Sequence, residues 1–311
     1  MTAVLDPFVL EHAPGPLVEL DSALGRARSA FHPALAAMAG LTDDQLTYQW
    51  MWGGHEADIR YSFYLGAWEV LARAQAEATR ALAGAPTSEA IDAVAATTAA
   101  RWQLHGVLAT LSEADLDADP GNGEWTIRRT LQHTINSQRG YAWGSAYWLS
   151  VRDQPRPSGP QRAPEGVFSG SPEEEDEALG DLASIRSELD DIVDATASRY
   201  ATLTEDEMVV KAGWAGLPVT IGFRQWRWSS HIVEHTIQVE KTLDMLGRRR
   251  SEVDWLARSV AAAYGRLEAA AFGRADAAAA AGVFDRVARE LSDLAQSVQA
   301  AAAAVVPGQE L

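Results

Sequence analysis

Apolar residues recur at helical spacing along most of the chain, and this periodicity constrains the fold more than any other feature of the sequence. Residues typical of helix starts and stops separate the periodic segments, whereas strand patterns are scarce. The sequence therefore predicts an all-α protein. The expected helices cover about 21–39, 55–84, 88–113, 126–151, 171–202, 223–246, 251–272 and 278–305.

The lengths of the connections between the long helices favour antiparallel packing, which predicts a four-helix bundle over residues 86–248. Residues 1–85 are then expected to form an N-terminal helical extension. Residues 249–311 are expected to form a C-terminal helical hairpin packed on the bundle. Within the bundle, residues 208–222 contain glycine and proline between extended stretches and predict a short hairpin.

Three of the expected helices begin at residues that typically cap a helix. Thr126 is expected to cap the second bundle helix. The third begins at Ser171, with Pro172 in the first helical position and Glu174 placed to complete a capping box. Ser251 starts the first helix after the bundle.

The charge of the chain excludes one large class of partners. The 311 residues include 43 acidic and 26 basic side chains, which gives a formal net charge of −17. Such a field repels phosphate backbones, so we expect no nucleic-acid partner. No apolar run is long enough to span a membrane, and the first residues lack the pattern of a signal peptide. We therefore expect a soluble, cytoplasmic protein with no membrane partner.

The sequence contains no cysteine, which excludes disulfides, cysteine-ligated zinc, iron–sulfur clusters and a cysteine nucleophile. A thiol that takes part in its chemistry must arrive with a substrate or cofactor. Lys211 and Lys241 are the only lysines among the 26 basic residues. Together with the abundant alanine, this composition favours a GC-rich bacterial genome.

Two histidines stand four residues apart on the fourth bundle helix. His231 and His235 leave the same helix face one turn apart, which allows both imidazoles to bind one metal ion. Two ordinary helix histidines are the alternative. The segment also has the His-x-x-Glu-His pattern of inverted zinc peptidases, with Glu234 as the base. Those enzymes need a further acidic ligand well downstream, and no supporting pattern occurs there, so a peptidase is disfavoured.

A third histidine, His133, lies on the second bundle helix, eight residues after Trp125. Here the sequence resembles the DinB-like (YfiT-type) superfamily of four-helix-bundle metalloproteins. The second helix of that family starts with Trp-Ser/Thr-aliphatic and carries a histidine eight residues after the tryptophan. The family's fourth helix carries His-x-x-x-His-x-x-Gln, which matches His231, His235 and Gln238.

The residues that lead into the fourth helix, 216–220, also look like the Gly-Pro-aliphatic-Thr segment of this family. The resemblance covers about 86–248. It implies that His133, His231 and His235 bind one divalent metal ion, with zinc expected and nickel or iron as alternatives. Three protein ligands leave a position open for another molecule, as in catalytic sites.

Residues on the same helix faces are candidates for the surroundings of this centre. Asn136 and Ser137 follow His133 by one helical turn, and Glu234 and Gln238 flank the other two histidines. Glu234 and Gln238 are candidates to orient an imidazole or to receive a proton, and Asn136 is a candidate to bind the cofactor or substrate. Ordinary surface or interhelical hydrogen bonding is the alternative for each of them.

Three residues that precede the histidine pair are candidates for binding an anionic substrate or cofactor. They are Arg224, Arg227 and Trp228. The alternative is a solvated helix start with a packing tryptophan. His12, His32, His55 and His105 have no metal-ligand spacing and are expected to be structural or exposed.

Members of the resembled family often use the ion to hold a low-molecular-weight thiol as the thiolate. Examples are mycothiol and bacillithiol S-transferases and mycothiol-dependent maleylpyruvate isomerase. The isomerase branch often has glutamate where this chain has His231, which favours the transferase branch. The resemblance thus implies a metal-dependent transferase in which a thiol co-substrate, with mycothiol expected, attacks an electrophilic small molecule.

Two other interpretations stay open. A metal-dependent hydrolase or lyase would use a metal-bound water and turn over without a thiol. A non-catalytic, metal-binding stress-response module would close the metal with a fourth protein ligand. A small-molecule substrate is the expected partner, and a homodimer is compatible with the sequence, which does not determine the oligomeric state.

Overall fold

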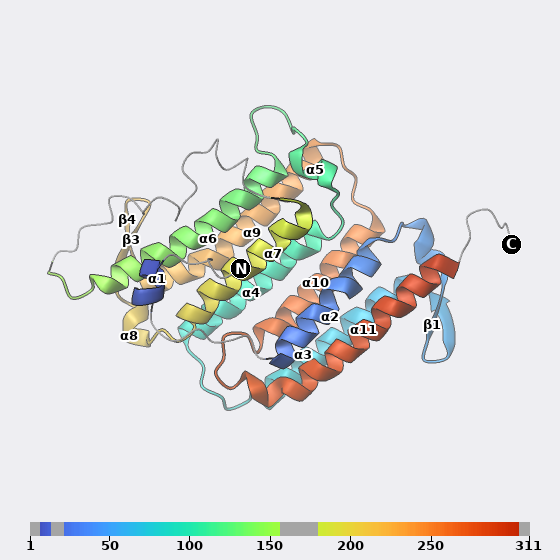
Figure 1. The fold of residues 1–311 in the computed structure, drawn as a ribbon, viewed down its shortest axis with the longest axis horizontal. Coiled ribbons are helices and arrows are strands. Elements are labelled where there is room, and N and C mark those ends of the chain that lie inside the picture. Colours follow the sequence, from blue (N-terminus) through green and yellow to red (C-terminus); the bar gives the residue numbers. More distant parts are fainter. Residues whose placement is uncertain (1–6, 14–21, 156–179, 305–311) are drawn as a thin grey trace.

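The computed structural model describes residues 7–13, 22–155 and 180–304, and this part of the chain is mostly helical, which confirms the all-α class (Figure 1). Four helices at the expected positions form the bundle, and they pack around one core in the order α4, α9, α6, α7. They are α4 (Glu89–Leu108), α6 (Ile127–Ser150), α7 (Leu182–Tyr200) and α9 (Ile221–Met245).

A second group of four helices lies beside the bundle (Figure 1). It consists of α2 (Ser22–Ala39), α3 (Glu69–Ala81), α10 (Glu252–Ala269) and α11 (Ala281–Ala304). The N-terminal and C-terminal helices of this group share one hydrophobic core. The division of the chain at residues 85 and 248 stays a prediction, and the structure adds that the two outer segments pack on each other.

Helix α4 is buried on nearly all sides because it lies between the two groups. Val94 and Trp102 belong to the core of the second group, whereas Leu104 and Leu108 belong to the core of the bundle. A helix that is apolar all round is expected where neighbours cover every face. α4 therefore ties the second group to the bundle that carries the histidines.

Glycines allow α10 to approach α4 closely. A Cβ atom on Gly265 would lie 2.7 Å from the Cβ of Trp102. We expect Gly265→Ala to lower the free energy of unfolding by about 1–2 kcal/mol, because the cost of overpacking exceeds the gain in helix propensity. Urea unfolding measures this change. Gly282→Ala is the control, since nothing lies within 4 Å of that position, and it should stabilise by up to about 1 kcal/mol. A stabilised Gly265→Ala variant would contradict the close packing.

The helix expected over 55–84 is wrong in its first part. β1 (Gln49–Trp52) and β2 (His55–Asp58) form an antiparallel hairpin, which is followed by a π-helix, η2 (Ser62–Trp68), and then by α3. Gly53 and Gly54 in the turn have φ angles of +56° and +82°. A two-residue hairpin turn requires such angles and glycine adopts them readily, so the Gly-Gly pair was the available signal.

The short hairpin expected within 208–222 is confirmed by β3 (Lys211–Trp214) and β4 (Leu217–Thr220). Thr126 accepts the backbone N–H of Arg129, and Ser251 forms a capping box, as their sequence positions predict. The predicted cap at Ser171 lies outside the described residues. The smaller helices are α1 (Pro7–His12), η1 (Asp44–Thr47), α5 (Glu113–Asp117), α8 (Glu205–Met208) and η4 (Ala277–Ala280).

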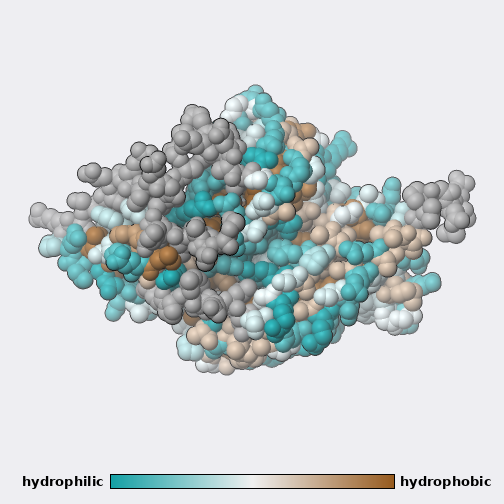
Figure 2. Space-filling view, in the orientation of Figure 1, coloured by the Kyte–Doolittle hydropathy of each residue, from teal (hydrophilic) through white to brown (hydrophobic). Residues whose placement is uncertain are grey.

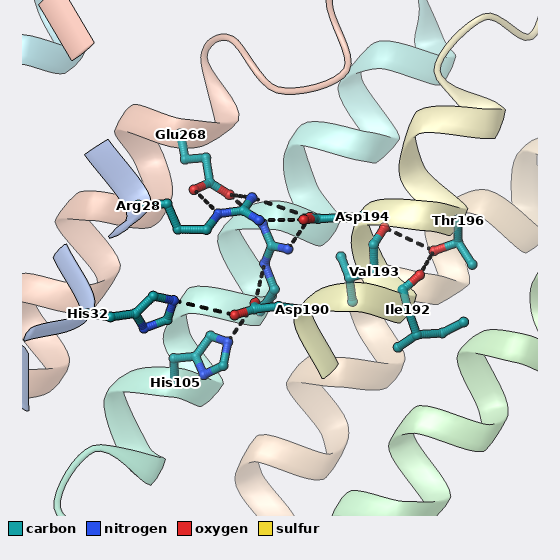
Figure 3. Close-up of polar contacts among 10 residues, drawn as sticks. Arg28, His32, His105, Asp190, Ile192, Val193, Asp194, Thr196 and Glu268 are labelled. Atoms are coloured by element: carbon teal, nitrogen blue, oxygen red, sulfur yellow. Dashed lines mark hydrogen bonds and ion pairs between the residues drawn. The ribbon is translucent and has the colours of Figure 1, made fainter. Parts of the chain in front are cut away.

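A largely buried network of ionisable side chains joins the bundle to the second group (Figure 3). It consists of Arg28, His32, Arg101, His105, Asp190, Asp194 and Glu268, from α2, α4, α7 and α10. Glu268 is fully buried and pairs with both arginines, and its Oε1 lies 2.7 Å from Nη2 of Arg28. Burial of charge is tolerated only where it is paired, so this network favours one relative arrangement of the four helices.

The surface in Figure 2 mixes hydrophilic with weakly hydrophobic residues along α2 and α11, whose large apolar side chains lie in the core. No helix in the described part of the chain is long and apolar enough to cross a membrane.

Candidate metal centre

The centre is built from two neighbouring helices of the bundle. α6 carries His133, and α9 carries His231 and His235. The two helices run antiparallel, since Oγ1 of Thr242 near the end of α9 donates to the carbonyl of Trp125 just before α6. From this contact α6 runs back along α9, so the first third of α6, with His133, lies beside the middle of α9, with His231 and His235.

The three imidazoles converge closely enough to share one ion. One ring nitrogen from each of His133, His231 and His235 lies within 4.8 Å of the other two. The Nε2 atoms of His231 and His235 are 2.9 Å apart. Nitrogens bound to one zinc ion at about 2.0–2.1 Å are at most about 4.2 Å apart. Small rotations of the side chains are enough to bind one ion, so this donor set fits a divalent metal.

The protonation of these histidines also suits metal binding. Burial, together with the neighbouring histidines, lowers the pKa of His231 to about 2. Burial also lowers the pKa of His133 and His235. Metal ligation requires neutral imidazoles, so near pH 7 no proton has to be displaced from these three side chains.

Gln238 orients one of the three histidines. Its Oε1 lies 2.8 Å from Nδ1 of His235, and because an amide oxygen only accepts, this contact assigns the proton to Nδ1. The lone pair of His235 is then on Nε2, the atom that faces His231. An outer contact of this kind fixes the tautomer and direction of a metal-binding histidine.

Glu234 lies at the exposed side of the centre, where its side chain is 56% exposed and forms an ion pair with Arg227. The hydrogen bond from Arg227 lowers the pKa of Glu234, so this carboxylate is ionised at neutral pH. The guanidinium of Arg227 also lies 5.5 Å from the ring centre of Trp214. These residues place a neutralised charge pair and an aromatic ring beside the histidines.

Two other candidates are buried in the packing of the bundle. Nη1 of Arg224 donates to the carbonyl of Gly213 at 2.8 Å, and its Nε donates to Oγ of Ser145 at 3.3 Å. Trp228 is 1% exposed and packs edge-on against Tyr200. The sequence suggested that both residues contact an anionic ligand. In the structure, both side chains instead contact other residues of the protein.

The two candidates that follow His133 on α6 differ in their contacts. Asn136 is buried, and its Oδ1 accepts from Gln132 and from Arg139. Ser137 lies closer to the centre, with its Oγ 3.4 Å from Nε2 of His133. Of these two candidates, Ser137 is therefore the one that contacts His133 directly.

Two aromatic residues lie beside the centre, of which sequence reasoning did not name Tyr141 and used Trp125 only as the start of a helix motif. The ring centre of Tyr141 lies 5.5 Å from that of His231, and the ring centre of Trp125 lies 5.1 Å from that of His133. Burial raises the pKa of Tyr141, so it keeps its hydroxyl proton at neutral pH. Tyr141 follows His133 by eight residues, about two helical turns, and this spacing was the signal that could have found it.

A four-helix bundle with three histidines converging from two helices defines a class of candidate metalloprotein. Residues 96–239, which include all three histidines, match the family model of the DinB superfamily. The match supports the DinB-like resemblance for this part of the chain. No curated protein and no solved structure matches the chain.

Proposed function

We propose that this protein is a metal-dependent transferase that joins a low-molecular-weight thiol to an electrophilic small molecule. His133, His231 and His235 hold the divalent ion, for which zinc is the expected metal. The carrying observation is the convergence of their ring nitrogens within 4.8 Å. The thiol and the transferase branch rest on the DinB-like resemblance, with mycothiol as the expected thiol.

The number of candidate ligands is compatible with a further ligand on the ion. Three protein side chains make up the group of candidate ligands within the described residues. Glu234 is not one of them, because its carboxylate forms an ion pair with Arg227 on the exposed side of the centre. Three histidines leave at least one coordination position for a substrate atom, which is the arrangement of catalytic zinc sites.

When bound, a divalent ion acts as a Lewis acid that favours the thiolate form of a thiol whose free pKa is near 8.5. The chain supplies the remaining functions. Gln238 keeps His235 in the tautomer that directs Nε2 to the centre. Glu234 is ionised and solvent-accessible, so it can accept the proton released by the thiol and pass it to water.

The overall reaction forms one carbon–sulfur bond. The sulfur supplies the electron pair, the leaving group or the double bond of the electrophile takes up a pair, and the thiol proton passes to Glu234 or to solvent. The protein has no cysteine that could form this bond instead, so the nucleophile must come from the co-substrate.

The experiment that tests this function is an activity screen of the zinc-loaded protein with a panel of electrophiles, with and without mycothiol. We expect loss of electrophile only when the thiol is present, and loss of this activity after chelation and its return with added zinc. The same turnover without a thiol would overturn the transferase and support the hydrolase or lyase interpretation. Undiminished turnover in the chelated protein would overturn the role of the metal.

A further inference from the structure

One arginine next to the metal centre has an unfavourable position in its helix. Arg129 is the third residue of α6, at the position where glutamate or glutamine completes a capping box with a residue such as Thr126. The first turn of α6 contains no acidic residue. Positive charge at a helix N-terminus opposes the helix dipole, so neither capping nor the dipole accounts for an arginine here.

Arg129 also differs from the other arginines of α6 in having no carboxylate partner. Arg128 pairs with Asp117, and Arg139 pairs with Glu188. Within the described residues, the side chain of Arg129 forms no ion pair or hydrogen bond, and its Nε is buried without a partner. An unsatisfied buried donor is costly, which raises the question of what it binds.

The position of Arg129 connects it to the three histidines. Its guanidinium carbon lies 4.8 Å from the ring centre of Trp125, and Trp125 in turn packs edge-on against His133, with their ring centres 5.1 Å apart. The guanidinium is therefore no farther from the His133 ring centre than these two distances combined. Stacking on Trp125 restricts the guanidinium while leaving its N–H groups free.

The other basic side chains near the centre already have partners, and the donors of Arg224 bind the carbonyl of Gly213 and Oγ of Ser145. Arg227 pairs with Glu234, and Lys241 pairs with Glu124. Arg129 is thus the basic side chain beside the histidines that keeps its charge available within the part of the chain described here. A guanidinium binds a carboxylate through two parallel hydrogen bonds.

We infer that Arg129, stacked on Trp125, is a specificity-determining residue that binds the carboxylate of a small molecule held at the three-histidine centre. This inference rests on the proposed function and adds the chemical class of its ligand. The carboxylate belongs either to the thiol or to the electrophile.

The test uses the full-length protein loaded with Co²⁺, because a thiolate bound to cobalt gives a near-ultraviolet charge-transfer band that reports binding without turnover. N-acetylcysteine and N-acetylcysteamine are the thiol probes, since they differ only in the carboxylate. Propanoate and propanamide, titrated by calorimetry into protein loaded with N-acetylcysteamine, are the matching probes for the electrophile, since they lack the double bond to which the thiolate would add.

The variants are Arg129→Gln and Arg129→Glu, with Arg128→Gln as the matched control that removes the same charge from the adjacent position. In the wild type we expect the carboxylate probe of one pair to bind about tenfold more tightly than its partner. The pair that shows this preference identifies the source of the carboxylate. Both Arg129 variants should lose the preference, and Arg128→Gln should keep it.

Arg129→Glu separates binding from folding. A glutamate here completes the capping box with Thr126 and suits the helix dipole, so its melting temperature should equal or exceed that of the wild type. Equal preferences in the wild type and in both Arg129 variants would overturn the inference.

A thiol band missing from the wild type would count against the proposed function. Calorimetry with N-acetylserine, which keeps the carboxylate and replaces the thiol by a hydroxyl, then tests Arg129 separately. Weaker binding of N-acetylserine to Arg129→Gln than to the wild type would still support the inference, and equal binding would overturn it.

Discussion

His231→Ala is expected to abolish stoichiometric metal binding and, with it, the thiol-dependent activity. His231 supplies one of three ring nitrogens within 4.8 Å, and its Nε2 is 2.9 Å from that of His235. Removing an outer partner of a metal ligand typically costs about 10–100-fold in affinity. Loss of the ligand itself should therefore cost more than about 100-fold.

The measurement is metal content by mass spectrometry after dialysis, followed by competition with a chromophoric chelator. Gln238→Leu provides an intermediate case, because it leaves three histidines but removes the contact that orients His235. We expect it to weaken metal binding by about 10–100-fold. His55→Ala is the matched control, since His55 is exposed on β2 and outside the group.

Thermal unfolding gives a second measure of the same site. A ligand that binds only the folded protein stabilises it by about 4 kcal/mol at a concentration 1,000 times its dissociation constant. Zinc should therefore raise the melting temperature of the wild type and of His55→Ala, and leave that of His231→Ala unchanged. Full metal content together with a normal zinc-dependent shift in His231→Ala would contradict the three-histidine centre.

Helical spacing identified the histidine group from the sequence because it depends on local geometry. A separation of four residues puts His231 and His235 on one face of any regular helix. The position of His133 came from the resemblance, which supplied the pairing of two helices that are distant in sequence. The match over residues 96–239 supports that resemblance, whereas the thiol chemistry that the resemblance implies stays a prediction.

Tertiary environment explains what the sequence could not give. Arg224 is only four residues from Trp228 and three from Arg227, yet its donors bind backbone carbonyls in the interior, while Arg227 reaches Glu234 at the surface. Periodicity gives the face of a residue on its helix, but it does not give the acceptors on neighbouring elements. For the same reason, the sequence could not predict that Nε of Arg129 is buried without a hydrogen-bond partner.

The second group of helices shows a further limit of sequence reasoning. Residues 21–39 and 251–272 were expected to be helical, and α2 and α10 confirm this. Arg28 and Glu268 in these helices are separated by 240 positions and meet in a buried ion pair. No local pattern marks such a pair, because the apolar face that surrounds it looks the same with or without a partner.

Glu268→Gln is expected to destabilise the folded protein by about 3–5 kcal/mol, the typical cost of removing one partner from a buried ion pair. Glu268 and Arg101 are both fully buried, and Arg28 is nearly so. The substitution keeps the shape of the side chain but leaves two buried guanidinium groups with Asp194 as their shared partner. Urea unfolding at pH 7 measures the change.

The control for this substitution is Glu69→Gln, which removes the same charge from an exposed pair with Arg73 and should change stability by less than about 1 kcal/mol. A loss of similar size in both variants would mean that the network contributes no more than a surface pair. A much larger loss for Glu268→Gln supports the network as the element that fixes the second group against the bundle.

The pH dependence of stability gives an independent test of the network. Burial opposes the charged form of Glu268, but Arg28 and Arg101 outweigh it and hold its pKa below the usual value. Ionised Glu268 thus contributes to the free energy of unfolding above about pH 4.3, the pKa of glutamate in the unfolded chain. This contribution is lost as the pH falls through the lower pKa that Glu268 has in the folded protein. Glu268→Gln has no such group, so its stability should fall less steeply in acid than that of the wild type.

His105 acts in a higher pH range. Burial lowers its pKa to about 4, so the folded protein keeps it neutral while the unfolded chain binds a proton below about pH 6.5. Its contribution is therefore lost between these two values as the pH falls, before Glu268 titrates. The Glu268→Gln and Glu69→Gln variants both keep His105. Their free energies of unfolding should therefore fall in parallel with that of the wild type over this pH range. Divergence of Glu268→Gln from the wild type only below about pH 4.3 would then assign the acid-labile part of the stability to this buried carboxylate.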